Sequence, residues 1–354
     1  MKRLRVLQLD SGGTWRGGQR QVLLLSLGLR DLGHEAFLIG SPGSPLVEKA
    51  RAAGLPVGAI QMAADWDVRA ARRIRARMRA WNIDLVHAHD ARSHALAMIA
   101  LIGRHEIPLV VTRRVVFTPR SVKLKYGPRV TRFIAISNAV KDAMVSAGID
   151  ASRITVIHSG ITLASEPVTP RDWRSELGWP HDSTVCGIVG AMTNEKGLDL
   201  LGEIGAALPP ATRQRVRIVL LGGRRATVTE PASLVIHAAG FVDDIDPAIA
   251  GLDILIHPSR TEGLGTAVID AMSLGVPPIA FAVGGVPEVI DNDISGVLVP
   301  ADDTRAFAAQ LARLIDDEAL RARLSQGARI KAKTFDATEM TNQTESVYEE
   351  LLSG

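Results

Sequence analysis

Hydrophobic runs of strand length alternate with amphipathic, helix-like stretches along the whole chain. In the first 160 residues, we predict strands at Leu4–Asp10, Glu35–Gly40, Asp84–His89, Leu109–Thr112, Arg132–Ser137 and Ile154–His158. The pattern then restarts, with strands predicted at Val185–Val189, Arg217–Gly222, Leu234–Ala238, Asp253–Pro258, Pro278–Ala282 and Gly296–Val299. Helical patterns lie between the strands, for example over Gly18–Leu32 and Asn138–Ala147. This alternation predicts parallel sheets that are covered by helices on both faces.

The alternation is interrupted once, between Ser159 and Pro180, where Pro, Ser and Thr are frequent and strand periodicity is lost. A chain of 354 residues is also too long for one ordinary core. We therefore predict an α/β protein with two doubly wound, Rossmann-like domains facing each other across a cleft. Residues 1–160 form the first domain and residues 161–336 the second. Residues 337–354 form a C-terminal helix, for which packing back on the first domain is one option.

Composition narrows the class of protein. Hydrophobic residues make up 46% of the chain and charged residues 22%, which is ordinary for a soluble globular enzyme. The single cysteine, Cys186, allows no internal disulfide and suits a reducing compartment. The first residues are too short and polar a stretch for a signal peptide, and no apolar run is long enough to span a bilayer. We expect a cytoplasmic protein, with association at the inner face of the plasma membrane left open.

Charge is distributed unevenly behind a net value of +3. Residues 1–160 hold 25 Lys and Arg against 11 Asp and Glu, whereas residues 161–354 hold 16 against 27. Six arginines lie between Arg69 and Arg79, and five cations lie between Arg113 and Lys125. Both groups are either solvated surfaces or contacts for an anionic acceptor or anionic lipid. Nucleic acid is not expected, because no aromatic stacking pattern accompanies the charge.

The strongest chemical signal is the segment from Pro258 to Met272. It follows a predicted buried strand, forms a glycine-containing loop and enters a helix predicted over Thr266–Leu274. Glu262 lies in the loop and Asp270 on the helix, with seven residues between them. Open α/β sheets bind ligands at this end of their strands, and the start of a helix offers N–H groups to an anion. Carboxylates accept strong hydrogen bonds from hydroxyl groups, so the pair indicates a sugar-binding site.

Three glycine loops after predicted strands indicate where phosphate groups would bind. In Gly190–Gly197, Lys196 adds a point charge to backbone N–H groups, which favours a diphosphate site. Gly17 and Gly18, after the first strand, form a second backbone cradle. Gly284–Val289 either offers amides to the same anion or only turns the chain. No loop matches the Walker spacing or a clean dinucleotide-binding fingerprint, and plain strand-to-helix turns remain the alternative for each.

His87, His89 and Asp90 end another predicted strand, a combination that invites a metal interpretation. No further His or Cys cluster completes a four-ligand set, so we expect no metal site. Hydrogen bonding inside the fold and a role on the acceptor side of the cleft stay open for these residues.

Taken together, these segments resemble the family-4 glycosyltransferases, which are retaining enzymes of the GT-B fold. The resemblance covers nearly the whole chain. Its most specific part, Leu252 to Met272, is similar to the family's E-x7-E region. Supporting matches are Gly190–Gly197, Phe241–Asp244, Gly284–Val289 and Ile157–Ile161.

The resemblance implies a role for each matching residue. Glu262 would contact the donor-sugar hydroxyls, Asp270 the nucleotide ribose and Lys196 the diphosphate. The backbone of Gly263, Leu264 and Gly265 would meet phosphate or sugar, and Phe241 and Val242 would border the base. Gly190 belongs to the same diphosphate loop, and Gly17 and Gly18 would reach the diphosphate from the first domain. The residues expected to take part in catalysis are Glu262, Lys196, Arg114 and His89.

Three departures from the family pattern stand out. The second acid is Asp270 where the family has Glu. Ala191 stands where an Arg is usual, and Arg114 stands where the family has a His.

The resemblance also implies an activity. It is metal-independent, retaining transfer of a sugar from a nucleotide-diphosphate donor to a hydroxyl of an envelope glycan or lipid-linked acceptor. No cofactor is expected, and the partners are the nucleotide sugar and the acceptor, which is an anion if the basic residues bind it. Polysaccharide or lipopolysaccharide biosynthesis would follow. A nucleotide-sugar epimerase of similar fold and a non-catalytic nucleotide-sugar-binding partner are the alternatives. The donor base, the sugar, the acceptor, the linkage and the oligomeric state are left unspecified.

Overall fold

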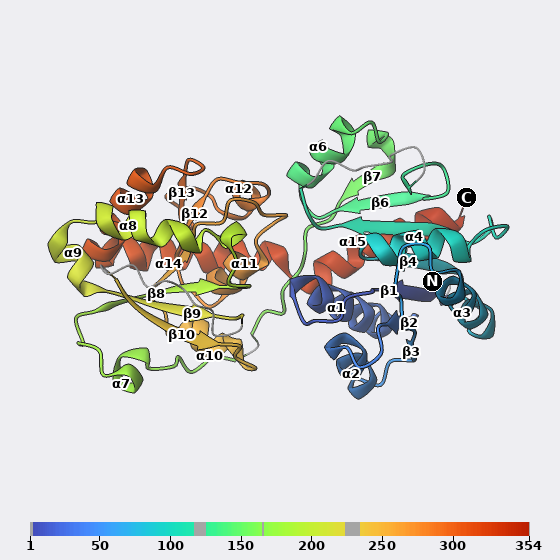
Figure 1. Ribbon diagram of the computed structural model, residues 1–354, viewed down its shortest axis with the longest axis horizontal. Helices are drawn as coiled ribbons and strands as arrows, with labels where there is room; N and C mark the ends of the chain where they lie inside the picture. Colours follow the sequence, from blue (N-terminus) through green and yellow to red (C-terminus); the bar gives the residue numbers. More distant parts are fainter. Residues whose placement is uncertain (1–2, 117–124, 165, 224–233, 354) are drawn as a thin grey trace. The chain divides into compact units, whose positions relative to one another are not determined.

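The computed structural model describes residues 3–116, 125–164, 166–223 and 234–353. Its contacts divide the chain into two compact units. Unit 1 comprises Met1–Gly160 and Ala337–Gly354, and unit 2 comprises Ile161–Asp336. Each unit is an α/β fold around one parallel sheet (Figure 1), so the predicted fold class is confirmed.

Unit 1 contains a seven-stranded sheet in the order β3-β2-β1-β4-β5-β6-β7, with every pairing parallel. Its strands are β1 (Arg5–Leu9), β2 (Glu35–Gly40), β3 (Val57–Ala59), β4 (Leu85–Ala88), β5 (Leu109–Arg113), β6 (Arg132–Ala135) and β7 (Ile154–Val156). Its helices are α1 (Gly17–Asp31), α2 (Pro45–Ala52), α3 (Val68–Ala80), α4 (Ala91–Ala100), α6 (Asn138–Ser146) and α15 (Ala337–Ser353), with a 3₁₀ turn at Ala151–Arg153.

All six predicted strands of unit 1 are present, with ends that differ by at most two residues. His89 and Ser137, expected inside strands, lie just after them, where Asp90 and Ser137 cap the helices that follow. The edge strand β3 escaped prediction because Val57-Gly58-Ala59 is too short to show a period.

The C-terminal helix α15 packs against α1 and joins the hydrophobic core of unit 1. Tyr348 is fully buried in that core. Glu345 accepts a hydrogen bond at 2.6 Å from Nε2 of His34, whose Nδ1 accepts one from the Leu4 amide. The last helix of the sequence is therefore part of the first sheet's packing (Figure 1).

The end of the first segment of unit 1 is held by a side-chain clamp. Gln21 of α1 donates to the Gly160 carbonyl at 2.7 Å and accepts from the Gly160 amide at 2.9 Å. A Cβ atom at Gly160 would lie 2.5 Å from Cα of Ala337, the first residue of α15. Glycine is required here because the backbones of the two segments of unit 1 run this close.

Unit 2 contains a six-stranded sheet in the order β10-β9-β8-β11-β12-β13, again with every pairing parallel. Its strands are β8 (Thr184–Val189), β9 (Val216–Leu221), β10 (Val235–Gly240), β11 (Ile254–His257), β12 (Pro278–Phe281) and β13 (Val297–Val299). Its helices are α7 (Trp173–Leu177), α8 (Leu201–Ala207), α9 (Pro210–Arg215), α10 (Ile245–Ala250), α11 (Thr266–Ser273), α12 (Val286–Val289), α13 (Thr304–Asp316) and α14 (Glu318–Ala332). Short 3₁₀ turns lie at Asn194–Lys196, Leu198–Leu200 and Lys333–Phe335.

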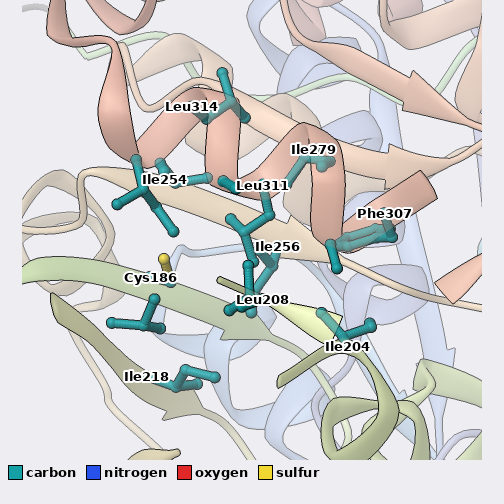
Figure 2. Close-up of a cluster of buried hydrophobic side chains, with 14 of the residues drawn as sticks. Cys186, Ile204, Leu208, Ile218, Ile254, Ile256, Ile279, Phe307, Leu311 and Leu314 are labelled. Carbon is teal, nitrogen blue, oxygen red and sulfur yellow. The ribbon is translucent and has the colours of Figure 1, made fainter. Parts of the chain in front are cut away.

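The core of unit 2 forms where helices cover its sheet. Phe307, Leu311 and Leu314 of α13 pack over Ile254, Ile256 and Ile279 of the central strands (Figure 2). Cys186 of β8 lies in the same cluster, fully buried, and burial raises the pKa of its thiol strongly. The thiol is therefore a small hydrophobic group of the core, consistent with its sequence context.

Both sheets reverse their strand order at one point, between β1 and β4 in unit 1 and between β8 and β11 in unit 2. Loops on the two sides of such a switch point diverge and leave a crevice at the carboxyl end of the strands. Several residues singled out from the sequence follow these strands, among them Gly17, Asp90, Lys196 and Glu262.

Candidate active site

Three loops of unit 2 converge on Glu262, each from the carboxyl end of a different strand. A Cβ atom at Gly197, in the loop after β8, would lie 1.9 Å from the carbonyl oxygen of Pro258. A Cβ atom at Gly284, after β12, would lie 1.8 Å from the carbonyl oxygen of Glu262. Both glycines have positive φ, +71° and +53°. Their role is thus geometric, because any side chain would push the loops away from Glu262.

Arg260 ties the loop of Lys196 to the loop of Glu262. Its amide donates to the carbonyl of Glu195 at 2.9 Å, and its guanidinium donates to the carbonyl of Asn194 at 2.9 Å. The same guanidinium binds Asp199 in a two-point contact of 2.7 and 2.8 Å. Bidentate contacts of this kind fix geometry as well as adding energy, so Lys196 is held in register with Glu262.

Glu262 is the centre of a charged group that we call the Glu262 triad, made of Glu262, Lys196 and His257. Lys196 Nζ donates to Oε1 of Glu262, and Nε2 of His257 lies 2.9 Å from the same oxygen. Burial alone would raise the pKa of Glu262, but the hydrogen bonds and charges of His257 and Lys196 outweigh it and lower the pKa to about 2. The carboxylate is therefore ionised at any physiological pH.

His257 is the member of the triad that sequence reasoning missed. It is the last residue of β11, is 1% exposed and points its ring at Glu262. The signal that was available is its position, since a polar residue that ends an otherwise apolar strand lies at the ligand-binding edge of the sheet.

Asp270 lies one turn into α11 and is half-buried, with its backbone carbonyl bonded to the Ser273 hydroxyl. Leu264 is buried, and Gly265, with φ +92°, precedes the first turn of α11 without a side-chain cap. Gly263 directly follows Glu262, and Gly190 directly follows β8, where a Cβ atom would lie 3.4 Å from Cε of Lys196. The residues predicted for sugar and diphosphate thus follow the two strands of the switch point, β8 and β11.

Phe241 and Val242 directly follow β10 at the edge of the same sheet. Phe241 is 63% exposed, an unusual state for a large aromatic ring, and Val242 is half-buried. An exposed ring at the carboxyl edge of the sheet offers a face on which a planar base can stack.

In unit 1, the loop after β1 is organised by two carboxylates. Asp90 accepts from the amide of Ser11 at 2.6 Å and from its hydroxyl at 2.7 Å, and it also caps α4. Asp10 accepts from the Gly12 amide at 2.8 Å. Burial, followed by the charge of Asp90, raises the pKa of Asp10. The amides of Ser11 and Gly12 are thus committed to protein carboxylates, which leaves Gly17 and Gly18 as the glycines that open α1.

Arg114 extends from the end of β5 to the start of α1. A Cβ atom at Gly18 would be in ordinary contact, 3.6 Å, with Cδ of Arg114. The guanidinium lies 3.0 Å from Nδ1 of His89, and Nε2 of His89 lies 2.6 Å from the side-chain oxygen of Gln8. Burial lowers the pKa of Arg114 to about 10, and the Asp10 carboxylate opposes the fall. The arginine therefore remains charged at neutral pH.

The polar side-chain atoms of His87, His89 and Asp90 are all hydrogen-bonded to other groups of unit 1. His87 contacts Tyr348 and Thr112 through its two ring nitrogens, at 2.5 and 2.6 Å. Among the residues that the structure describes, no group of three or more His, Cys, Asp or Glu side chains is placed to hold a metal ion. The absence of a metal site stays a prediction.

Arg113 and Lys125, at the two ends of the segment with five cations, each contact another side chain of unit 1. Arg113 is buried with its guanidinium 5.6 Å from the centre of the Tyr126 ring, and Lys125 pairs with Asp65 at 2.6 Å. Arg120 and Lys123 lie outside the described residues.

Comparison with known proteins decides what kind of enzyme carries this site. Residues 15–165 match the family profile described as "Glycosyltransferase Family 4", and residues 183–317 match "Glycosyl transferases group 1". A D-inositol 3-phosphate glycosyltransferase of Xylanimonas cellulosilytica is 30% identical over 302 residues, which are 75% of this chain and 71% of the relative. The chain belongs to the family-4 glycosyltransferases. A second relative of the same name, from Saccharomonospora viridis, is 29% identical over 76% of this chain and 70% of its own length.

The fold of this glycosyltransferase is shared by solved GT-B structures. The Anabaena protein HepE, crystallised with UDP and glucose, superposes with a TM-score of 0.85 over 98% of this chain and 100% of its own, at 20% identity. At that identity the likeness supports the fold alone. Within the described ranges, no helix combines the length and apolar character needed to cross a bilayer.

The family's pattern and this glycosyltransferase differ at defined places in the structure. Ala191, where an Arg is usual, directly follows Gly190 in the loop that carries Lys196. In unit 1, Arg114 takes the place of the usual His and is joined to His89.

Proposed function

We propose that this glycosyltransferase moves a sugar, with retention of configuration, from a nucleotide-diphosphate donor to a hydroxyl of an anionic acceptor, without a metal ion. The acceptor is an envelope glycan or a lipid-linked sugar, as in polysaccharide or lipopolysaccharide biosynthesis. The observation that carries the proposal is the Glu262 triad at the switch point of unit 2, where an ionised carboxylate and a lysine stand side by side.

On the donor side, Lys196 neutralises the diphosphate together with the N–H groups after β8 and at the start of α11. A positioned cation and oriented amides stabilise the negative charge that develops on the leaving phosphate. This is the charge that a metal ion would otherwise balance, so we assign the task to Lys196. Asp270 binds the ribose, and Phe241 and Val242 border the base.

Glu262 then acts on the sugar. Its low pKa keeps it ionised, so it accepts hydrogen bonds from sugar hydroxyls and favours positive character at the anomeric carbon. His257 holds the carboxylate in place. The bond from the anomeric carbon to the leaving phosphate breaks, the bond to the acceptor oxygen forms on the same face, and the leaving phosphate takes the acceptor's proton.

On the acceptor side, Arg114 and the basic character of unit 1 favour an anion. The named relatives act on D-inositol 3-phosphate, which supports an acceptor with a phosphate or similar group. Arg114 is charged and lies at the carboxyl edge of the unit 1 sheet, so we assign it to this group.

Helix α3 offers a second anionic contact, with the inner face of the plasma membrane. Its buried side is Ala70, Ala71, Ile74 and Met78, and its exposed side carries Arg69, Arg72, Arg73, Arg77 and Arg79. Trp66, just before the helix, is 77% exposed. Arginines beside an exposed tryptophan suit an anionic lipid surface.

The proposal is tested in two steps with the whole protein. UDP, GDP and ADP are first screened for thermal stabilisation, since a ligand raises stability in proportion to the logarithm of its concentration over Kd. The matching nucleotide sugars, beginning with UDP-glucose, are then incubated with inositol phosphates and lipid-linked sugars, with and without EDTA.

We expect nucleoside diphosphate release that depends on the acceptor, an anomeric configuration that matches the donor by NMR, and no loss in EDTA. Conversion of the donor without an acceptor would indicate an epimerase and overturn the proposal. Loss of transfer in EDTA that Mg²⁺ restores would overturn its metal-independent form.

A further inference from the structure

A continuous line of six polar side chains crosses the core of unit 1. It consists of Arg114, His89, Gln8, Tyr348, His87 and Thr112, and we call it the unit 1 relay. The guanidinium of Arg114 lies 3.0 Å from Nδ1 of His89, whose Nε2 lies 2.6 Å from Oε1 of Gln8. Nε2 of Gln8 lies 3.5 Å from the Tyr348 hydroxyl, a weak contact. That hydroxyl lies 2.5 Å from Nδ1 of His87, and Nε2 of His87 lies 2.6 Å from Oγ1 of Thr112.

Chemistry gives the unit 1 relay one direction. A guanidinium can only donate, so Nδ1 of His89 must accept and its proton must sit on Nε2. The Nε2–H group of His89 donates to the Gln8 oxygen, so the Gln8 amide nitrogen faces Tyr348. Tyr348 accepts there and donates to Nδ1 of His87, whose Nε2 proton reaches Thr112. We assign these protons from the hydrogen-bond network, and in this arrangement every contact pairs a donor with an acceptor.

Burial keeps the histidines of the relay neutral. His87 and His89 are 1% and 4% exposed, and their ring centres lie 4.1 Å apart. Burial first, and then the positive charge of Arg114, holds the pKa of His87 well below the ordinary range. Burial first, then the neighbouring His87 ring and Arg114, does the same for the pKa of His89. Neither ring can therefore bind a second proton and reverse the direction at neutral pH.

Arg114 depends on this line more than an exposed arginine would. Its Nε atom is buried and finds no hydrogen-bond partner among the described residues, so His89 is a main polar anchor of the guanidinium. If the Gln8 amide turned over, its NH₂ group would face Nε2 of His89 and drive the His89 proton to Nδ1. Two donors would then meet at Arg114, and the guanidinium would be displaced.

We infer that Tyr348, on the C-terminal helix α15, is a positioning residue for Arg114, because its hydroxyl is the acceptor for the Gln8 amide nitrogen and so helps to keep the Gln8 oxygen on the Nε2–H tautomer of His89 that Arg114 requires. In this assignment His89 holds Arg114 and transfers no proton. The inference rests on the proposed function, in which Arg114 binds the anionic group of the acceptor. It deepens that function by making acceptor binding depend on a helix that ends the chain.

The relay closes on itself at a small cavity. Thr112, its last member, and Arg114, its first, both line a cavity of about 20 Å³, with His87, Gln21 and Ser159. A space of this size with several polar groups suits one water molecule. Thr112, at one end of the unit 1 relay, and Arg114, at the other end, therefore lie beside the same cavity.

The first test needs no substrate. Nitrogen-15 NMR of the full-length protein reports the tautomers of His87 and His89, and inorganic phosphate is titrated while the Nε signal of Arg114 is followed. In the wild type we expect the Nε2–H tautomer for both rings between pH 6 and 8, and a response of Arg114 to phosphate. A proton on Nδ1 of His89, or an Arg114 signal indifferent to phosphate, would overturn the inference.

The second test removes one hydroxyl. Tyr348→Phe should populate the Nδ1–H tautomer of His89 and weaken phosphate binding roughly tenfold, the size of one lost charge-assisted hydrogen bond. In turnover assays it should raise the acceptor KM and leave the donor KM unchanged. Arg114→Lys should do the same, and the double variant should be no worse than Arg114→Lys, because both changes remove one interaction.

Glu345→Gln is the matched control, since Glu345 lies on α15 and anchors the helix to His34 outside the relay. If Glu345→Gln raised the acceptor KM as much as Tyr348→Phe, the effect would come from docking of the helix and the inference would be lost. Gln8→Leu, which breaks the relay on β1, provides a second route to the same expected change if Tyr348→Phe folds poorly. Failure of the wild type to transfer any sugar would instead refute the proposed function, and the NMR result would still decide the relay.

Discussion

The two units share one topology but build their polar centres in opposite ways. In unit 2, the centre of the triad is the ionised carboxylate of Glu262, and the side chain of its partner Lys196 is 23% exposed. In unit 1, the polar centre is a buried line of neutral side chains that ends in one cation, Arg114. A charged group that binds and releases a diphosphate must exchange partners with the ligand, whereas a single cation that must hold its place is better anchored by neutral donors and acceptors.

Net charge follows the same division. Unit 1 contains 25 Lys and Arg against 15 Asp and Glu, and unit 2 contains 16 against 23. Helix α15 contributes four glutamates and no Lys or Arg, and Glu350 pairs with Arg132 of unit 1. The acidic last helix thus offsets part of the charge of the basic unit on which it packs. The excess that remains in unit 1 favours an anionic partner there.

The largest expected effect comes from neutralising the centre of unit 2. Glu262→Gln keeps the size of the side chain but removes the charge that favours the transition state. We expect kcat to fall on the order of 100-fold with little change in nucleotide affinity. Asp270→Asn should instead weaken nucleoside diphosphate binding.

Glu195→Gln, an exposed acid in the neighbouring loop, is the control for these two variants. Nucleotide affinity by calorimetry and kcat are measured for each protein. The two roles are reversed if Glu262→Gln loses nucleotide affinity while Asp270→Asn keeps it.

Lys196→Ala removes the cation that pairs with Glu262 and that we assign to the diphosphate. A charged hydrogen bond is worth about 1.5–3 kcal/mol, so kcat/KM for the donor should fall roughly 10- to 100-fold. The pKa of Glu262 should rise at the same time, because one of the charges that lowers it is gone. Lys333→Ala, an exposed lysine of the same unit, should behave as wild type. Unchanged turnover of Lys196→Ala would show that the diphosphate is held elsewhere.

Glycine-to-alanine variants in one loop of each unit test how tightly the two loops are packed. Gly284→Ala would force a Cβ atom against the carbonyl oxygen of Glu262 at positive φ, so we expect a loss of about 1–3 kcal/mol of unfolding free energy and of activity. Gly18→Ala meets only an ordinary contact of 3.6 Å and should fold with wild-type stability. Urea unfolding of both variants checks this. Equal destabilisation would mean that the unit 1 loop is as tightly built as that of unit 2.

Acidification should destabilise unit 1 at a higher pH than unit 2, because different buried groups titrate in the two units. Burial holds the pKa values of His87 and His89 well below the usual 6.5, and that of His94 at about 3. The unfolded chain then takes up protons that the folded unit 1 refuses, so its stability should fall as pH drops below about 6.5. Glu262, with its pKa lowered from 4.5 to about 2, stabilises unit 2 fully above 4.5 and loses that contribution only as pH falls toward 2.

Hydrogen exchange measured by mass spectrometry at pH 7 and 5.5, corrected for the intrinsic rate, tests this difference. Peptides of β1, β4 and β5 should lose protection before those of β8 and β11. Asp10, whose pKa is raised above 3.8, acts in the opposite sense, because the folded unit takes up its proton at a higher pH than the unfolded chain does. Loss of protection first in unit 2 would contradict the assignment of neutral histidines.

The smallest effect concerns the basic surface of unit 1. Each arginine near anionic lipid contributes about 1 kcal/mol, so Arg73→Gln should weaken binding to phosphatidylserine vesicles roughly fivefold at low salt. Arg51→Gln, on α2, is the control. Sedimentation with anionic and neutral vesicles provides the measurement. Equal binding to both kinds of vesicle would leave the arginines of α3 as a solvated surface.

Sequence reasoning was sufficient for whatever depends on local pattern. The predicted fold class, the family and the glycosyltransferase activity are confirmed, because alternating apolar runs and the Pro258 to Met272 segment are contiguous in the chain. The predicted roles of Glu262, Asp270 and the other site residues stay predictions. Retention, metal independence and the anionic acceptor are likewise proposals.

What depends on how the chain turns and packs came only from the tertiary structure. His257 ends a strand like many other residues, and only the turn after β11 brings its ring to Glu262. Tyr348 and His87 are 261 positions apart, so no local pattern links them. The sequence by itself determined which elements form and which edge of each sheet carries the chemistry, because periodicity and glycine placement are local properties. Only the packed structure decided which ring nitrogen, amide or hydroxyl faces which partner, because burial leaves each polar group with the few neighbours that packing provides.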